Sequence, residues 1–165
     1  MRVTSSSECK RSARLSISFS HTQMRRIVNA IAEIGKCPQY LSILENVIIV
    51  NGRPLRRNQN LVMKLLTEKQ HDLLVLFNDP ESVRLRNALI RTRDHVTNPD
   101  SLLNFHMGLI DLMVKCCRGK IYEAEIKCQS LYSLHDLYLQ FKDPINLRMV
   151  KAYFVKYVGE LVRSA

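Results

Sequence analysis

From residue 20 onward, apolar side chains recur at steps of three and four residues, the spacing of one helical face. Gly35 and Pro38 separate the first two runs. Gly35 suits a left-handed C-cap, and Pro38 suits a first helical turn, where its missing N–H is not needed. Ser20 or Thr22 can cap the first helix. The apolar positions of the two runs are Met24, Ile27, Val28, Ile31 and Ile34, then Tyr40, Leu41, Leu44, Val47 and Ile48.

The second run enters a β-branched stretch, residues 47–50, that is compatible with a helix or a strand. The helical spacing that continues into it from Tyr40 favours a helix, ended by Asn51 and Gly52. Asn58 is then placed to cap a third helix. Its inward positions are Leu61, Val62, Leu65 and Leu66.

The apolar segment 73–77 is again compatible with a helix or a strand. The sequence Asn78-Asp79-Pro80 follows, which is typical of a cap and a first-turn proline. It predicts a helix through Arg93. This helix has few apolar positions, so we expect it near the surface.

The clearest helical pattern begins at Asn98-Pro99 and carries two adjacent apolar rows. Such a wide stripe predicts an inner helix that contacts two other helices at once. One row is Leu102, His106, Leu109, Met113 and Cys116, and the next is Leu103, Met107, Ile110, Val114 and Cys117. The opposite side holds Asn104, Gly108, Asp111 and Lys115.

Beyond Gly119 the pattern predicts a short helical piece at 123–128, a helix capped by Ser133 and a last helix opened by Asp143-Pro144. The chain therefore reads as seven or eight helices with short connections and no β-hairpin. Helix-opening prolines recur 42 residues apart, at 38 and 80, and 45 residues apart, at 99 and 144. These steps are near the roughly 40–47 residues of HEAT and armadillo repeats. We predict an all-α, armadillo/HEAT-like helical solenoid.

Charge divides the chain into two parts. The whole sequence carries 25 Lys and Arg against 15 Asp and Glu, a net charge of +10. Residues 1–20 are basic and Ser-rich without a sustained period, which predicts a disordered tail ahead of a helical domain at 21–165. A mitochondrial transit peptide is the alternative for this tail. No apolar run is long enough to span a bilayer, so no membrane span is expected.

Few residues suggest chemistry. The sequence has no glycine-rich phosphate loop, metalloprotease motif or nucleophile elbow, so we expect no catalytic site, no cofactor and no metal. The five cysteines form no CxxC pair, which favours reduced thiols. Cys116 and Cys117 fall on the buried rows, where packing is the favoured role. His106 lies there too and is expected to be a core histidine.

The arginines at 53, 56 and 57 form the one candidate site. Arg53, Arg56 and Arg57 follow the predicted turn, and a guanidinium cluster can bind a phosphate or an acidic partner surface. The alternative interpretation is that these arginines belong to a solvent-exposed loop that binds no partner. Nucleic acid is not expected, because aromatic residues are not interleaved with these basic ones.

Several segments, in this order, resemble the homology domain shared by ryanodine receptors and inositol trisphosphate receptors, with the last ones closer to the inositol trisphosphate branch. The resemblance spans about residues 25–165. The segments are 44–52, 58–63, 74–79, 106–117, 119–120, 125–128 and 134–136.

This resemblance implies a helical-solenoid segment in the cytoplasmic assembly of a calcium-release channel. Such a segment relays conformational changes from ligand-binding regions to a tetrameric pore. The implied partners are the other domains and subunits of that channel, and the implied place is the cytosolic face of the endoplasmic reticulum. The chain contains neither the pore nor the ligand-binding core, so inositol trisphosphate contacts are not carried over to the three arginines.

Two other readings stay open. One is a stand-alone, cytoplasmic armadillo-like adaptor that binds acidic or phosphorylated partners through Arg53, Arg56 and Arg57. The other is an organellar enzyme or nucleic-acid-binding protein with a cleaved basic leader.

Overall fold

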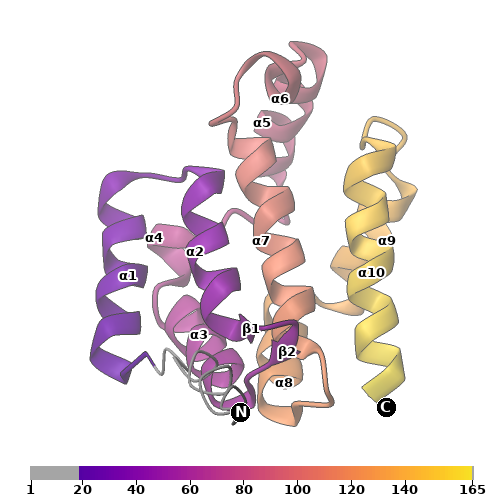
Figure 1. Ribbon diagram of the computed structural model, residues 1–165. Helices are drawn as coiled ribbons and strands as arrows, with labels where there is room; N and C mark the ends of the chain where they lie inside the picture. Colours follow the sequence, from indigo (N-terminus) through magenta and orange to yellow (C-terminus); the bar gives the residue numbers. More distant parts are fainter. Residues whose placement is uncertain (1–18, 165) are drawn as a thin grey trace, which may run out of the picture.

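The computed structural model describes residues 19–164, and this part of the chain is helical apart from one short antiparallel hairpin (Figure 1). The predicted tail lies almost wholly outside the described residues. The elements are α1 (His21–Ile34), α2 (Pro38–Ile48), β1 (Ile49–Val50), β2 (Arg53–Pro54), α3 (Arg56–Glu68), α4 (Gln70–Leu73), α5 (Pro80–Arg91), α6 (Asp94–Thr97), α7 (Leu102–Cys117), α8 (Tyr122–Leu131), α9 (Leu134–Lys142) and α10 (Arg148–Ser164).

The prediction of an all-α protein is confirmed at the level of fold class. The expected number of seven or eight helices is too low, because residues 19–164 form ten helices, and the expectation of no hairpin is wrong. Helix α2 ends at Ile48, and the next two residues pair with β2 in the register Ile49 to Pro54 and Val50 to Arg53. The turn residues Asn51 and Gly52 have φ angles of 52° and 74°. Two positive φ angles suit a tight hairpin turn, for which Asn-Gly is the preferred pair. The turn chemistry therefore overrides the helical spacing.

Several predicted helix starts are confirmed by their caps. The side chain of Ser20 accepts a hydrogen bond from the amide of Gln23, and Ser133 does the same for Asp136. Asp79 accepts from the amides of Glu81 and Ser82. Each of these three residues belongs to a reciprocal capping box, which satisfies amides that have no partner inside the helix.

Three other starts are wrong. Asn58 lies inside α3, where its amide group donates to the carbonyl of Val47, 2.8 Å away, at the end of α2. The helix expected from Asn98-Pro99 begins at Leu102, capped by Ser101. The helix expected from Asp143-Pro144 begins only at Arg148.

Apart from α4, α5 and α6, the helices form two rows in Figure 1, with α1, α2, α7 and α10 in front and α3, α8 and α9 behind. Contacts within the front row join α2 to α7 and α7 to α10, and α3 contacts α8 in the back row. The two rows contact each other through α1 with α3, α7 with α8, and α10 with α9. In α5 only Arg86 is buried, as expected for a helix near the surface.

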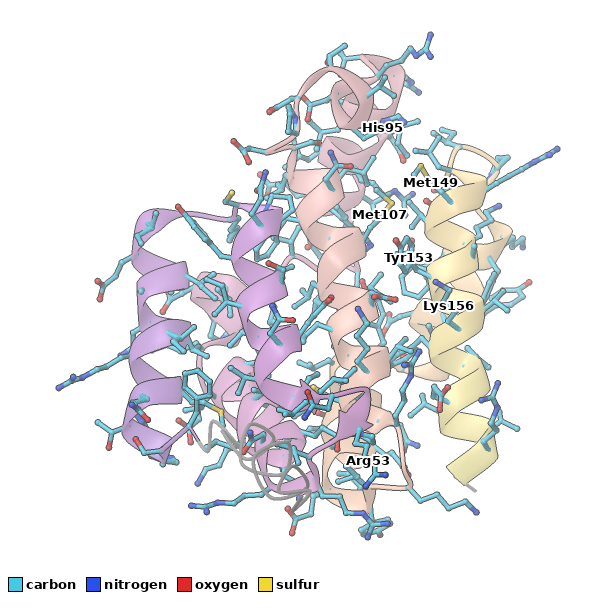
Figure 2. All side chains as sticks on the ribbon, viewed as in Figure 1. Arg53, His95, Met107, Met149, Tyr153 and Lys156 are labelled. Carbon is cyan, nitrogen blue, oxygen red and sulfur yellow. The ribbon has the colours of Figure 1, made fainter. Side chains whose placement is uncertain are left out.

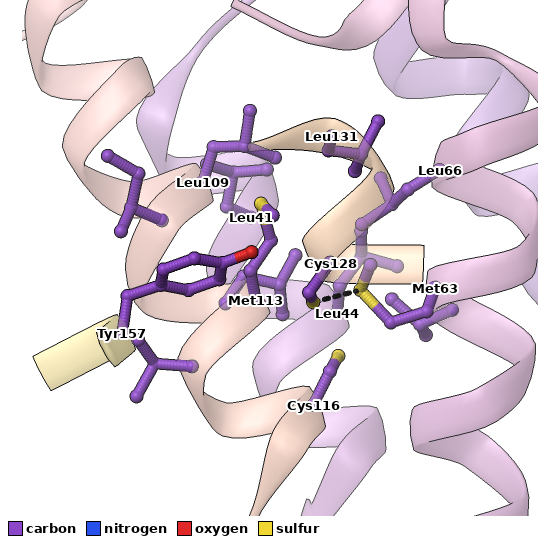
Figure 3. Close-up of a cluster of buried hydrophobic side chains, with 14 of the residues drawn as sticks. Leu41, Leu44, Met63, Leu66, Leu109, Met113, Cys116, Cys128, Leu131 and Tyr157 are labelled. Atoms are coloured by element: carbon purple, nitrogen blue, oxygen red, sulfur yellow. Dashed lines mark hydrogen bonds between the residues drawn. The ribbon is translucent and has the colours of Figure 1, made fainter. Parts of the chain in front are cut away.

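Helix α7 is the centre of this arrangement, and its predicted role as an inner helix is confirmed. It contacts α2, α3, α6, α8 and α10. Even its polar side is packed, because a Cβ built on Gly108 would lie only 3.0 Å from Cδ1 of Leu41 on α2. Figure 3 shows part of the core around α7, where Leu109 and Met113 lie near Met63, Cys128 and Tyr157, with Leu41 of α2 in the same cluster.

The ambiguous segment 73–77 is neither a continuous helix nor a paired strand. Helix α4 ends at Leu73, and the next residues cross the core without regular structure. Three successive carbonyls accept side-chain hydrogen bonds from three parts of the chain. The acceptor and donor pairs are Val75 with His106 Nδ1, Leu76 with the Tyr132 hydroxyl, and Phe77 with Gln140 Nε2.

Candidate functional site

The structure separates the three predicted arginines. Arg53 lies on β2 at the hairpin end of the molecule, where its side chain is exposed (Figure 2). Arg56 and Arg57 are the first two residues of α3 instead of loop residues. They therefore do not form one binding loop.

Arg56 has a structural contact. Its guanidinium donates to the carbonyl of Gly119, 3.1 Å away, in the turn that follows α7. The contact fastens the start of α3 to that turn. The Arg56 guanidinium therefore already has a hydrogen-bond partner within the chain. Of the three arginines, Arg57 is the better candidate for binding an anion.

Arg57 lines a cleft of about 240 Å³ between α1, α3 and α8. Three further basic side chains line the same cleft: His21 from α1, Lys64 from α3 and Lys127 from α8. The remaining lining residues are Asn60, Leu61 and Glu123. We call this cleft, lined by these seven residues, the basic cleft.

The charge balance of the basic cleft favours an anion. Its one carboxylate, Glu123, already accepts a hydrogen bond from Asn60 at 2.9 Å. Lys64 forms only a distant contact with Glu68, 3.9 Å away on the next turn of α3. Arg57 forms no ion pair within residues 19–164. One guanidinium and two ammonium groups thus face a single carboxylate. This excess of positive charge can bind a phosphate or an acidic side chain.

Sequence reasoning missed most of this cleft. Arg57 and Lys64 are seven residues apart, which places them on one face of a helix. The sequence spacing alone could therefore have predicted that these two side chains lie close together. His21 and Lys127 come from other helices, and no local pattern links them to Arg57.

A second charged arrangement joins three helices. The ammonium of Lys115 on α7 lies 2.7 Å from Glu45 on α2 and 2.7 Å from Asp111 one turn earlier. The other oxygen of Asp111 lies 3.8 Å from the ammonium of Lys156 on α10. Figure 2 shows Lys156 on the side of α10 that faces α7. These four residues are called the α2–α7–α10 ion chain.

Lys115 is the centre of the ion chain and is only 19% exposed. Burial acts to lower the pKa of its amine, but the hydrogen bonds to Asp111 and Glu45 outweigh burial and raise the pKa. The ammonium is therefore held in its charged form at neutral pH. The sequence showed Asp111 and Lys115 on one helix face, but not the partners on α2 and α10.

A third polar cluster is buried between α5 and α9. Arg86 is 1% exposed, donates to Gln140 and forms an ion pair with Asp143. Asn146 donates to the backbone and side-chain oxygens of Gln140, both at 3.1 Å. A buried guanidinium with this many partners fixes the position of α5.

The core histidine and the buried thiols are confirmed. His106 is fully buried with Nδ1 2.6 Å from the Val75 carbonyl, and burial lowers its pKa to about 4. Cys116 and Cys117 are buried on α7, and burial raises the pKa of the Cys116 thiol. These residues support the fold.

Within residues 19–164, no group of three or more His, Cys, Asp or Glu side chains has a metal-binding arrangement. The described helices include none with the length and apolar character needed to cross a membrane. No protein-family model matches the chain.

Proposed function

We propose that this chain is a scaffold and allosteric-coupling segment of an intracellular calcium-release channel of the inositol trisphosphate receptor type. It acts on the cytosolic face of the endoplasmic reticulum, with no pore or catalytic site of its own. Support comes from the ordered resemblance over about residues 25–165. The two rows of helices fit the solenoid arrangement that this proposal includes.

The observation that carries the proposal is the position of α7. This buried helix lies between α2 and α10, and the ion chain links all three. The interior is close-packed, so a displacement of α2 cannot be absorbed by empty space beside α7. A movement on the α1–α2 side is therefore passed through α7 to α10.

The last two helices and the loop between them expose several large apolar side chains, and in a solenoid each repeat buries such side chains against the next. These residues are Tyr138, Leu139, Ile145, Met149, Val155 and Val162.

Two measurements test this function. Full-length transcript sequencing across both ends of the reading frame is expected to continue into ligand-binding repeats upstream and a pore-forming region downstream. Lys115→Met in that full-length protein is expected to raise the inositol trisphosphate concentration needed for half-maximal calcium release. A transcript that encodes neither region would contradict the proposal. An unchanged release curve would contradict the role of the ion chain.

A second candidate function is an adaptor for acidic or phosphorylated partners, and the basic cleft favours it. Three basic side chains, those of Arg57, Lys64 and Lys127, line the cleft around one carboxylate, which already accepts a hydrogen bond from Asn60. The cleft is large enough for a phosphate group or a carboxylate side chain. Binding through exposed cations of this kind weakens as salt rises.

The test of the adaptor function uses a phosphoserine peptide, its unphosphorylated form and a glutamate-substituted form. Arg57→Ala combined with Lys64→Ala is expected to weaken phosphopeptide binding at least tenfold. Arg84→Ala with Arg91→Ala is the control, because it removes the same charge from an exposed part of α5. Equal losses in both double variants would indicate a non-specific charge effect and reject the cleft.

A further inference from the structure

Two buried thiols face each other at the junction of α7 and α8. Cys117 is the last residue of α7, and Cys128 lies on α8. Their sulfur atoms are 3.3 Å apart, close enough for one thiol to donate a hydrogen bond to the other. Cys117 is 1% exposed and Cys128 is fully buried. A four-residue turn, 118–121, separates the two helices.

The surroundings of this pair are mostly apolar and rich in sulfur, with the hydroxyl of Tyr157 as a polar neighbour of Cys128. The sulfur of Met63 lies 3.8 Å from the Cys128 sulfur, and the ring of Tyr157 packs beside them (Figure 3). Cys116 is next to Cys117 in sequence but forms no hydrogen bond with Cys128 within the described residues. Adjacent positions on a helix point about 100° apart, so Cys116 and Cys117 do not occupy equivalent places.

We propose that Cys117 and Cys128 form a paired-thiol modification site, which a peroxide converts into an intrachain disulfide that fastens the end of α7 to α8. The sulfur atoms need to approach by a little more than 1 Å to reach the bond length of about 2.05 Å. The two cysteines lie on consecutive helices joined by a short turn, so this approach needs only a small adjustment of α8.

The reaction has two steps and balances with hydrogen peroxide as the oxidant. One thiolate attacks the peroxide, the O–O bond breaks, and a sulfenic acid forms while hydroxide leaves and takes up the thiol proton as water. The second thiol then attacks the sulfenic sulfur, and the S–O bond breaks as a second water leaves. Two thiols and one hydrogen peroxide give one disulfide and two waters.

Burial sets the expected rate. The hydrogen bond with Cys117 and the loss of hydration raise the pKa of the Cys128 thiol well above its usual value. Little thiolate is present in the closed state, so the reaction waits for opening of the α7–α8 junction. The disulfide is therefore expected to form slowly and to persist, because the apolar cluster also protects it from reductants.

The Cys117–Cys128 disulfide would affect the basic cleft on the surface as well as the buried core. Helix α8 contacts α3, and it contributes Lys127, the residue before Cys128, to the basic cleft. Fastening α8 to α7 limits the movement of that wall of the cleft. The proposal itself rests only on the thiol geometry and does not depend on the proposed function.

The experiment exposes the folded chain to graded hydrogen peroxide, blocks the remaining thiols and maps the peptides by mass spectrometry. Circular dichroism on the same samples checks that the chain stays folded. The expected product is a link between the peptide with Cys117 and the peptide with Cys128, with the loss of two hydrogens. The melting temperature of the oxidised chain is expected to be about 5 °C higher than that of the reduced chain, since a short cross-linked loop restricts the unfolded chain.

Cys116→Ser is the matched control and is expected to keep the link, whereas Cys117→Ser is expected to abolish it. If Cys117→Ser disturbs folding, mapping of the Cys116→Ser chain alone still identifies the bonded pair. Sulfinic or sulfonic acid at Cys128 without a link would overturn the proposal. A link that forms only after circular dichroism shows unfolding would overturn it too.

Discussion

The ammonium of Lys115 on α7 lies 2.7 Å from the carboxylate of Glu45 on α2. Asp111 holds the same ammonium from the previous turn of α7 at 2.7 Å. The two side chains of the Lys115–Glu45 pair are 19% and 27% exposed, so solvent screens the pair less than a surface ion pair. It is the most direct electrostatic connection between the first helices and the central helix.

Replacement of Lys115 by Met is expected to lower the free energy of unfolding by about 1–3 kcal/mol, because two half-buried carboxylates lose their cation. Urea unfolding at pH 7 measures this change. Lys156→Met is the control, since Lys156 is 59% exposed and 3.8 Å from Asp111. Its effect is expected to stay within about 0.5 kcal/mol. Equal effects of the two variants would contradict the central role of Lys115.

Acid is expected to destabilise the fold through His106. Its pKa is about 4 in the folded chain, below the ordinary value of 6.5, so the unfolded chain binds a proton first as pH falls. Stability contributed by neutral His106 is present above pH 6.5 and is lost as pH falls from 6.5 towards 4. The loss amounts to about 3 kcal/mol over this window.

Urea unfolding at pH 7, 6 and 5 measures this dependence for the natural chain and for His106→Gln. The variant is less stable at pH 7 but is expected to show a flatter profile between pH 7 and 5. Parallel profiles would show that other groups cause the acid sensitivity.

Loss of Arg86 is expected to release α5 from α9. Arg86→Met leaves Gln140 and Asp143 without their buried cation, and the expected loss of stability is about 3 kcal/mol or more. Arg84→Met, two residues earlier on the exposed side of α5, is expected to change stability by less than about 0.5 kcal/mol. Hydrogen exchange of α5 amides should accelerate only in the Arg86 variant. Similar exchange in both variants would refute the anchoring role.

Gly108 is expected to be required for the close approach of α7 and α2. A Cβ there would meet Leu41 at 3.0 Å, whereas one at Gly159 on α10 would meet nothing within 4 Å. Gly108→Leu is therefore expected to cost about 1–3 kcal/mol by overpacking. Gly159→Leu is expected to be neutral or stabilising by up to about 1 kcal/mol, because leucine is the better helix former. Thermal unfolding compares the two, and a stable Gly108→Leu chain would contradict the packing argument.

The sequence predicted a helix start correctly where the groups that stabilise the start are close together in the chain. Ser133 and Asp136 satisfy each other's amides over three residues, so the cap could be read directly. The burial of α7 could be predicted in the same way from its two apolar rows. Asn58 shows the limit of such reasoning, because it satisfies a carbonyl of α2 11 residues away instead of capping its own helix.

The candidate site was predicted only in part for the same reason. Arg57 belongs to the basic cleft, but Arg56 is held by Gly119, 63 residues further along the chain. Lys127 reaches the cleft from α8, and only the packing of α8 against α3 places it there. The sequence identified a basic segment, and the tertiary contacts selected which of its arginines is available.

The sequence by itself determined the helical class, the starts capped by Ser20, Asp79 and Ser133, and the buried face of α7, because periodicity and capping act over three to five residues. Only the tertiary structure decided the path of segment 74–77 and the partners of Lys115. It also decided the pairing of Cys117 with Cys128. The backbone carbonyls of Val75 and Phe77 accept hydrogen bonds from side chains 31 and 63 residues away in the sequence. Such contacts depend on how whole helices pack, which no local pattern specifies.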